Sequence, residues 1–401
     1  MLNRNWRLPE GVEELLPPQA WALEQVRRRV VDVFHAWGFD YVEPPIIEYL
    51  DALLVGTGAM GHETDLDLQT LKVVDQRSGR MLGVRADMTA QAVRIDAHSL
   101  AGSGDGVRRL CYAGPVVHAN PAGALDSRVP IKAGAEIFGS RSLAADAEVL
   151  ALLVEILDTA GVPEPVVVLG HMGVYLGLVE PFGLEPALER ELFAAVQSKS
   201  ETDIALLLDG RGDSTLLERL PTLMGDASVL GAARELLGNA PAPVRAAIEA
   251  LEQLAIRIES RCPELTIRFD LAELAGYGYH NGPIFSAYQS SQGQALARGG
   301  RYDGIGSAFG KGRPATGFDV SLMQLLSAGA VAPAVWAPWA GELDAAERGE
   351  LELAVRALRQ DGFRVVASVC EQDTPPVACN QGLQYVAGAW QLRDLKDVHQ
   401  T

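Results

Sequence analysis

The sequence predicts an α+β protein built on an antiparallel sheet flanked by helices. Strand-like segments come in neighbouring pairs that one loop could join, such as 109–117 and 131–138. Amphipathic helical stretches surround these pairs and do not alternate regularly with single strands, as they would in a parallel α/β sheet. With 401 residues, of which 48 % are apolar, the chain is long enough to bury a sizeable core.

The first half of the chain opens with a predicted helix at 17–37. Its apolar residues recur at helical spacing, Pro17 and Pro18 suit its start, and Gly38 suits its end. A strand is expected from Phe39 to Ile46, interrupted by two prolines. Further on we expect a strand, turn and helix over 81–95, the hairpin of 109–117 and 131–138, a helix over 144–160 and a buried strand over 165–169.

The second half of the chain has a different sequence pattern. Successive helices with polar turns predict a helical insertion at about 184–260, followed by strictly alternating strand residues at 265–271. Strands are then expected at 283–288 and 298–304, and helices at 317–328 and 343–360, with two strand-like runs after the last helix. The connector VAPAVWAPWAG divides the chain into a predicted main domain, 1–330, and a short C-terminal α/β region, 331–401.

Composition excludes several classes of function. The net charge of −18 disfavours nucleic-acid binding, because that affinity comes largely from Lys and Arg neutralising phosphates. No apolar run could span a bilayer, and the N-terminus lacks the apolar core of a secretion signal. The four cysteines show no CxxC spacing, which argues against a disulfide framework and a zinc site. We therefore expect a cytoplasmic protein without a bound metal or cofactor and without contact to a membrane.

Asp87 and Thr89 form the first candidate binding pair, in the stretch VRADMTAQAVR. They lie two residues apart near the expected end of a strand. A carboxylate and a hydroxyl at this place could bind an ammonium group. The alternative is that they cap the helix that follows.

Lys132 and Glu136 form the second pair, in KAGAE. In a strand, this even spacing places both side chains on one face, where opposite charges could line a polar site. The alternative is a surface or cross-strand ion pair worth less than about 1 kcal/mol.

A third candidate is the segment LAGYGYHNGPIF, in which glycines alternate with Tyr277, Tyr279 and His280. Aromatic rings on such a permissive backbone can shape a small-molecule site. A histidine without a catalytic partner or metal spacing is more often structural, so both interpretations stay open.

Taken together, these segments resemble class II aminoacyl-tRNA synthetases of the histidyl branch, over roughly residues 8 to 330. The stretches that carry the resemblance are GFDYVEPPIIEY (the dimer-interface motif), YAGPVVHANP with AGAEIFG (the second motif), RPATGFDVSLMQLL (the third motif), and GYGYHNGPIF and RGGRYDG (the two histidyl segments). The resemblance implies the class II synthetase-like fold.

The same resemblance indicates that the synthetase chemistry is lost. Its motifs place His118, Ala275 and Gln324 where an active enzyme carries arginines that hold ATP and the adenylate. Guanidinium groups stabilise a phosphoryl charge with a fixed bidentate geometry that these side chains cannot supply. Removing one preorganised donor typically costs about 10²–10³ in rate, so little amino-acid activation is expected.

The amino-acid side of the synthetase site is better preserved. The resemblance implies that Asp87 and Thr89 hold an α-amino group, and that Glu136, Tyr279 and His280 lie near an imidazole ring. Lys132 stands where a glutamine is usual.

This pattern is similar to the regulatory-subunit family of ATP phosphoribosyltransferase, which is paralogous to histidyl-tRNA synthetases. The resemblance implies a non-catalytic subunit that activates a short-form catalytic subunit and mediates feedback inhibition by histidine, in a hetero-octamer built on a class II-like homodimer. The alternatives are an active histidyl-tRNA synthetase and a synthetase-like amino-acid sensor for another partner.

Overall fold

The computed structural model describes residues 7–54, 65–120, 127–274, 279–290, 293–310, 312–326, 333–376 and 378–395. The chain divides into two compact units, one formed by residues 1–15 and 22–327 and the other by residues 16–21 and 328–401. No helix in the described ranges is both long enough and apolar enough to cross a bilayer.

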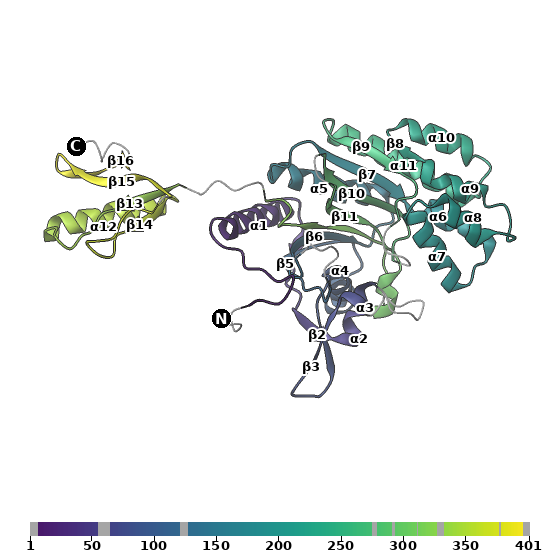
Figure 1. The fold of residues 1–401 in the computed structure, drawn as a ribbon, viewed down its shortest axis with the longest axis horizontal. Helices are drawn as coiled ribbons and strands as arrows, with labels where there is room; N and C mark the ends of the chain where they lie inside the picture. The colour runs from purple at the N-terminus through teal and green to yellow at the C-terminus, as the bar shows by residue number, and fades with distance from the viewer. Residues whose placement is uncertain are drawn as a thin grey trace. The chain divides into compact units, whose positions relative to one another are not determined.

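A nine-stranded sheet organises the main unit (Figure 1). Its strands lie in the order β1-β5-β6-β12-β11-β10-β7-β9-β8, and all neighbours are antiparallel except β1 with β5 and β7 with β9. This confirms the predicted α+β fold. The strands are β1 (Asp40–Tyr41), β5 (Arg108–Pro115), β6 (Ile131–Phe138), β7 (Pro165–His171), β8 (Met224–Gly225), β9 (Thr266–Asp270), β10 (Pro283–Gln289), β11 (Ala295–Arg301) and β12 (Ala315–Ser321).

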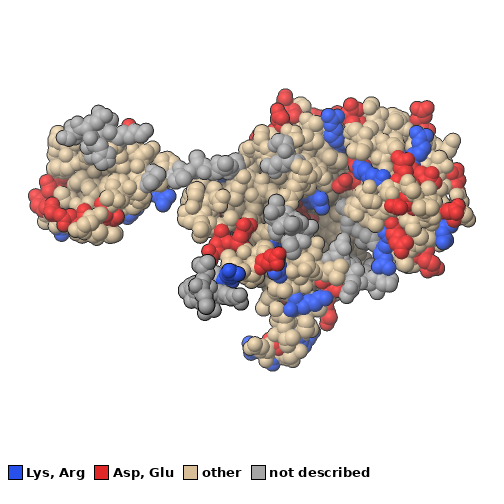
Figure 2. Space-filling view, in the orientation of Figure 1, with Lys and Arg blue, Asp and Glu red and all other residues tan. Residues whose placement is uncertain are grey.

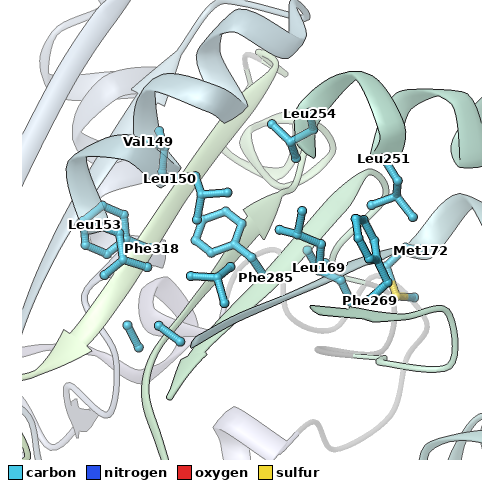
Figure 3. Close-up of a cluster of buried hydrophobic side chains, with 14 of the residues drawn as sticks. Val149, Leu150, Leu153, Leu169, Met172, Leu251, Leu254, Phe269, Phe285 and Phe318 are labelled. Carbon is cyan, nitrogen blue, oxygen red and sulfur yellow. The ribbon is translucent and has the colours of Figure 1, made fainter. Parts of the chain in front are cut away.

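Helices cover one face of this sheet, and the period of two along each strand explains why. Ala135 of β6, Phe318 of β12 and Phe285 of β10 point to the same face and are buried in the core. Figure 3 shows Phe285 and Phe318 beside side chains of α5 (Leu143–Thr159) and α11 (Ala242–Arg261). The alternate residues of these strands point to the opposite face, which carries the polar groups described below.

The main unit contains further helices besides α5 and α11. Helix α1 (Gln19–Ala36) buries its apolar stripe in the same core and begins beside Pro17 and Pro18, as predicted. The others in this unit are α2 (Leu50–Leu53), α3 (Asp65–Gln69), α4 (Thr89–Arg94), α6 (Met172–Val179), α7 (Pro186–Gln197), α8 (Glu201–Leu208), α9 (Thr215–Arg219) and α10 (Ser228–Leu236). In the view of Figure 2, acidic side chains are frequent over the region of α7 to α10.

A second, three-stranded sheet projects from the main unit in the order β2-β4-β3 (Figure 1). It consists of β2 (Ile47–Tyr49), β4 (Met81–Val84) and β3 (Leu71–Val74). One face packs on α2, because a Cβ atom at Gly83 would lie 2.7 Å from Leu53.

The second unit contains a four-stranded sheet in the order β14-β13-β15-β16. Helix α12 (Ala345–Gln360) packs on it through Leu351 and Val355 and begins with a capping box between Asp344 and Glu347. The strands are β13 (Ala334–Ala337), β14 (Arg364–Ala367), β15 (Cys379–Val386) and β16 (Ala389–Asp394).

Three local predictions were wrong. The stretch VAPAVWAPWAG, predicted to be a connector, contains the buried strand β13. The helix expected at 317–328 is replaced by strand β12 up to Ser321 and a turn from 322 to 325. Phe318 and Val320 alternate with Gly317 and Asp319, and this period of two places the segment between β6 and β11. The strand expected at 39–46 is only two residues long in β1, and pairing resumes in β2 after the two prolines, which cannot donate to a ladder.

A buried ion pair joins the end of β11 to the start of α5. Arg301 donates to both carboxylate oxygens of Asp146, at 3.1 Å from Nε and 2.8 Å from Nη2, and to the carbonyl of Ser140. The side chains of Arg301 and Asp146 are 8 % and 1 % exposed. Their pairing fixes the backbone just before Tyr302, which belongs to the site described next.

We predict that Asp146→Ala lowers the free energy of unfolding by about 3 kcal/mol, because it removes the buried carboxylate that accepts from two nitrogens of Arg301 and leaves the guanidinium only backbone carbonyls and Asp303. Urea denaturation measures this loss. Glu148→Ala is the matched control on the same helix, since it breaks the more exposed Arg109–Glu148 pair and should cost less than about 1 kcal/mol. Equal losses in both variants would contradict the assigned role of burial.

Candidate functional site

Glu136 lies at the centre of a hydrogen-bonded cluster on the face of the main sheet opposite α5 and α11. It projects from β6 and is 1 % exposed. Tyr112 of β5 donates to its Oε1 at 2.8 Å, and Tyr302, just after β11, donates to its Oε2. The Tyr112 hydroxyl is also 3.1 Å from Oγ1 of Thr89, the first residue of α4. One carboxyl group thus links three strands and a helix.

Two glycines create the space for this cluster. Gly134 lies directly opposite Tyr112 on β5, and a Cβ atom there would lie 2.6 Å from the tyrosine ring. Gly317 of β12 lies directly opposite Glu136, and a Cβ atom there would lie 1.6 Å from Oε2. Any larger residue at either position would displace the cluster.

Burial raises the pKa of Glu136 to about 8, although hydrogen bonds from Tyr302 and Tyr112 act in the opposite direction. The carboxyl group is therefore mostly protonated at neutral pH. Burial also raises the pKa of Tyr112 and Tyr302 well above the usual value, so both phenols stay neutral donors. A site of this kind can exchange a proton with a basic ring that binds beside it.

Asp87 and Thr89 meet at the start of α4. Oδ1 of Asp87 accepts a hydrogen bond from the backbone N–H of Thr89 at 2.6 Å. Burial raises the pKa of Asp87, and the positive charge of Lys132 opposes that rise. The capping interpretation is not confirmed, because the N-cap residue of α4 is Met88 and the helix has no side-chain cap; Asp87 instead closes a turn just before the helix, and its charge interacts with that of Lys132.

Lys132 forms an ion pair with Asp319 across β6 and β12. Its Nζ is 3.0 Å from Oδ1 of Asp319, and both side chains are about a quarter exposed or less. Burial acts to lower the pKa of Lys132, but the charges of Asp319 and Asp87 outweigh it, and the pKa is raised. Lys132 is thus a cation held by carboxylates on the same face of the sheet.

Tyr279 and His280 close one side of the cluster with their rings. The ring centroids of Tyr279 and Tyr302 are 5.1 Å apart, and the His280 ring meets Tyr279 edge-on at 4.8 Å. Nδ1 of His280 is 3.2 Å from the carbonyl oxygen of Arg301 and donates to it, because a carbonyl can only accept. Burial lowers the pKa of His280 to about 4, so the ring is neutral.

The positions that the sequence assigned to lost arginines carry no guanidinium. Nε2 of His118 donates to the carbonyl of Ala86 at 3.1 Å, and burial lowers the pKa of its ring, which stays uncharged at neutral pH. Gln324 lies in the turn after β12, and its buried Oε1 has no hydrogen-bond partner among the described residues. Ala275 lies outside the described residues.

The structure therefore brings most of the candidate residues together. Hydrogen bonds and ring contacts connect Thr89 through the tyrosines and Glu136 to Tyr279 and His280, while Asp87 and Lys132 adjoin that chain. Sequence reasoning missed Tyr112, Tyr302 and Asp319 as site residues. Tyr302 lies in the recognised segment RGGRYDG, and Asp319 is the one carboxylate in the alternating run ATGFDVS.

Two known protein families together match nearly the whole length of the chain. Residues 11–325 match the histidyl-tRNA synthetase family, and residues 332–393 match the ATP phosphoribosyltransferase subunit HisZ C-terminal domain. An ATP phosphoribosyltransferase regulatory subunit of Pseudomonas fluorescens is 44 % identical over 97 % of this chain and 98 % of its own, and that of Alkalilimnicola ehrlichii is 45 % identical over 98 % of each.

The chain belongs to the ATP phosphoribosyltransferase regulatory subunits. It is a regulatory subunit by family, which links it to histidine biosynthesis and to a catalytic ATP phosphoribosyltransferase partner.

Solved structures agree on the fold. An ATP phosphoribosyltransferase regulatory subunit/histidyl-tRNA synthetase from Bacillus halodurans matches with a TM-score of 0.78 and 27 % identity, covering 92 % of this chain and 94 % of its own. A histidyl-tRNA synthetase from Nostoc matches with a TM-score of 0.79 at 16 % identity, covering 98 % and 96 %, which supports the fold alone.

We predict that Glu136→Gln gains stability relative to the unsubstituted protein as pH rises from 5 to 8. The folded-state pKa of Glu136 is raised, so the contribution of its protonated carboxyl to the stability of the fold is fully present below about pH 4.5. That stabilisation is lost as pH rises through about 8. Glutamine cannot ionise, so the difference in unfolding free energy should grow by up to about 1.4 kcal/mol per pH unit. Urea denaturation in a pH series measures it.

Glu24→Gln is the control for that series. Its side chain pairs with Arg27 and Arg28 on α1, which lowers its pKa to about 2, below the range tested. The difference between this variant and the unsubstituted protein should stay flat from pH 5 to 8. A flat difference for Glu136→Gln as well would show that the buried carboxyl is ionised throughout.

Proposed function

We propose that this chain activates a short-form catalytic subunit of ATP phosphoribosyltransferase and mediates its feedback inhibition by histidine, without activating an amino acid itself. The proposal rests on a contrast between the amino-acid side and the ATP side of one site. The residues suited to an imidazole and an ammonium group are assembled around Glu136, whereas the positions expected to hold ATP carry uncharged side chains.

Histidine matches the chemistry of the cluster in two parts. Its ammonium group would be held by Asp87 with the Thr89 hydroxyl, a charge-assisted contact. Its imidazole would approach Glu136 and the rings of Tyr279 and Tyr302, where a protonated carboxyl can share its proton with a basic nitrogen. The site therefore suits recognition of an amino acid with a basic ring.

Loss of adenylation follows from the neutral side chains. In adenylation the amino-acid carboxylate attacks the α-phosphorus of ATP and pyrophosphate leaves, which builds negative charge on the phosphoryl group. Neither His118, which donates to a backbone carbonyl, nor Gln324 can provide a bidentate cation there. The alternatives are an active histidyl-tRNA synthetase and a sensor that acts on another protein. Each gives a different result in the assay below.

The decisive measurement is phosphoribosyl-ATP formation by a purified short-form catalytic subunit, with and without this chain, across a histidine titration. We predict that the chain raises the rate and that histidine then suppresses it. In Asp87→Asn and Glu136→Gln, the histidine concentration for half inhibition should rise at least about 10-fold, because each removes a charged or proton-sharing contact.

Glu24→Gln, an exposed change on α1, is the matched control and should leave half inhibition unchanged. Indifference of the rate to this chain would reject the partner assignment. Histidine-dependent pyrophosphate exchange would then identify an active synthetase, and its absence would favour a sensor.

We also propose that the chain forms a homodimer, within a hetero-octamer with the catalytic subunit, through the three-stranded sheet. The face of that sheet opposite α2 is largely apolar, since the residues directly opposite one another on it are Ile47, Val84 and Leu71, and Tyr49, Leu82 and Val73. The guanidinium of Arg80 stacks on the Tyr49 ring, 3.5 Å from its centroid. Ile47, Tyr49 and Val73 are 53 %, 41 % and 37 % exposed. An apolar face of this extent is typical of an association surface, and a second copy is its proposed occupant.

We predict that Ile47→Asp and Val73→Asp shift this chain from dimer to monomer in sedimentation-velocity experiments, because each places a charge in the proposed interface. Val369→Asp is the control, since Val369 is 79 % exposed and lies in the second unit. A dimer that persists in both sheet variants would place the contact elsewhere.

A further inference from the structure

A row of polar side chains crosses the same face of the main sheet, beside the Glu136 cluster. Asp319 of β12 lies directly opposite Gly134 on one side and Arg298 of β11 on the other, and Arg298 lies directly opposite Ser286 of β10. Residues that are directly opposite in an antiparallel pair point to the same face, with Cβ atoms about 5 Å apart. Lys132 joins the row through its ion pair with Asp319.

The two cations of this row differ in how they are compensated. Lys132 is neutralised by Asp319 at 3.0 Å and is less than a quarter exposed. Arg298 is exposed and makes no hydrogen bond or ion pair with any residue that the structure describes. Its charge nevertheless reaches the site, because it acts to lower the pKa of Lys132.

A guanidinium that makes no hydrogen bond or ion pair with a described residue, next to the proposed amino-acid site, could bind a negatively charged group of the ligand. An α-amino acid carries a carboxylate on the same carbon as its ammonium group. The proposed function places the ammonium at Asp87 and Thr89 and the ring at Glu136, and it gives the carboxylate no partner. Arginine matches a carboxylate with two parallel donors, a geometry that lysine cannot reproduce.

We propose that Arg298 binds the carboxylate of the effector, so that the site selects a free α-amino acid over analogues in which the carboxylate is reduced or removed. This inference rests on the proposed histidine site and adds the residue that determines specificity. The Lys132–Asp319 pair supports it, because Asp319 holds the Lys132 ammonium on the sheet face and limits its competition for Asp87.

Calorimetric titration of the full chain with L-histidine and L-histidinol tests the inference. Histidinol keeps the ring and the ammonium group but carries a hydroxymethyl group in place of the carboxylate. The unsubstituted protein should bind histidine at least about 10-fold more tightly than histidinol. In Arg298→Gln, histidine affinity should fall by about 10- to 100-fold, as expected for loss of a charge-assisted pair, while histidinol affinity stays within about twofold.

Two further variants complete the design. Arg298→Lys keeps the charge without the forked geometry and should recover only part of the lost histidine affinity. Arg245→Gln, an exposed arginine of α11, is the matched control and should change neither affinity. Thermal melts of all variants verify that the fold is retained.

The outcomes separate this inference from the function on which it rests. Histidine binding that is unchanged in Arg298→Gln, or an equal loss for histidine and histidinol, would overturn the role of Arg298 and leave the histidine site standing. No binding of histidine to the unsubstituted protein would overturn the histidine site and this inference together.

Discussion

The buried carboxyl of Glu136 is the constraint on which the arrangement of the site depends. A carboxyl group that is 1 % exposed must be neutral or fully hydrogen-bonded, and here Tyr112 and Tyr302 satisfy it while burial keeps it largely protonated. Its neighbours follow from it. The positions opposite Glu136 and Tyr112 must lack a side chain, so Gly317 and Gly134 occur on strands that are otherwise continuous. The buried acid thereby determines which residues the adjoining strands can carry.

The sequence predicted the parts of this arrangement that depend on local periodicity. The spacing of Lys132 and Glu136 correctly placed both on one face, because a strand repeats every two residues whatever it pairs with. The role of Asp319 could not be found in the same way. Its segment was predicted to be helical, and a helix would not have placed Asp319 beside Lys132. Tyr112 and Glu136 are 24 residues apart in sequence, and only the pairing of β5 with β6 brings them together.

Asp87 shows a different limit of sequence reasoning. Helix capping and ligand binding were alternatives in the sequence, yet the structure contains the local hydrogen bond to Thr89 together with electrostatic contact to Lys132. The helix begins after Met88 without a side-chain cap, so Asp87 closes a turn before the helix, while its binding role remains a proposal. A local pattern therefore identified the residue without being able to choose its role.

The distribution of charge explains how a synthetase-like site can serve regulation. A triphosphate requires several converging cations, and His118 and Gln324 remove charge from positions that the family resemblance assigns to ATP-binding arginines. On the sheet face, Lys132 is cancelled by Asp319, so Arg298 remains as the cation without a described partner. The single positive charge of the Arg298 guanidinium would balance the single negative charge of an amino-acid carboxylate. The proposed site would therefore match the charges of a zwitterionic amino acid better than those of a nucleotide.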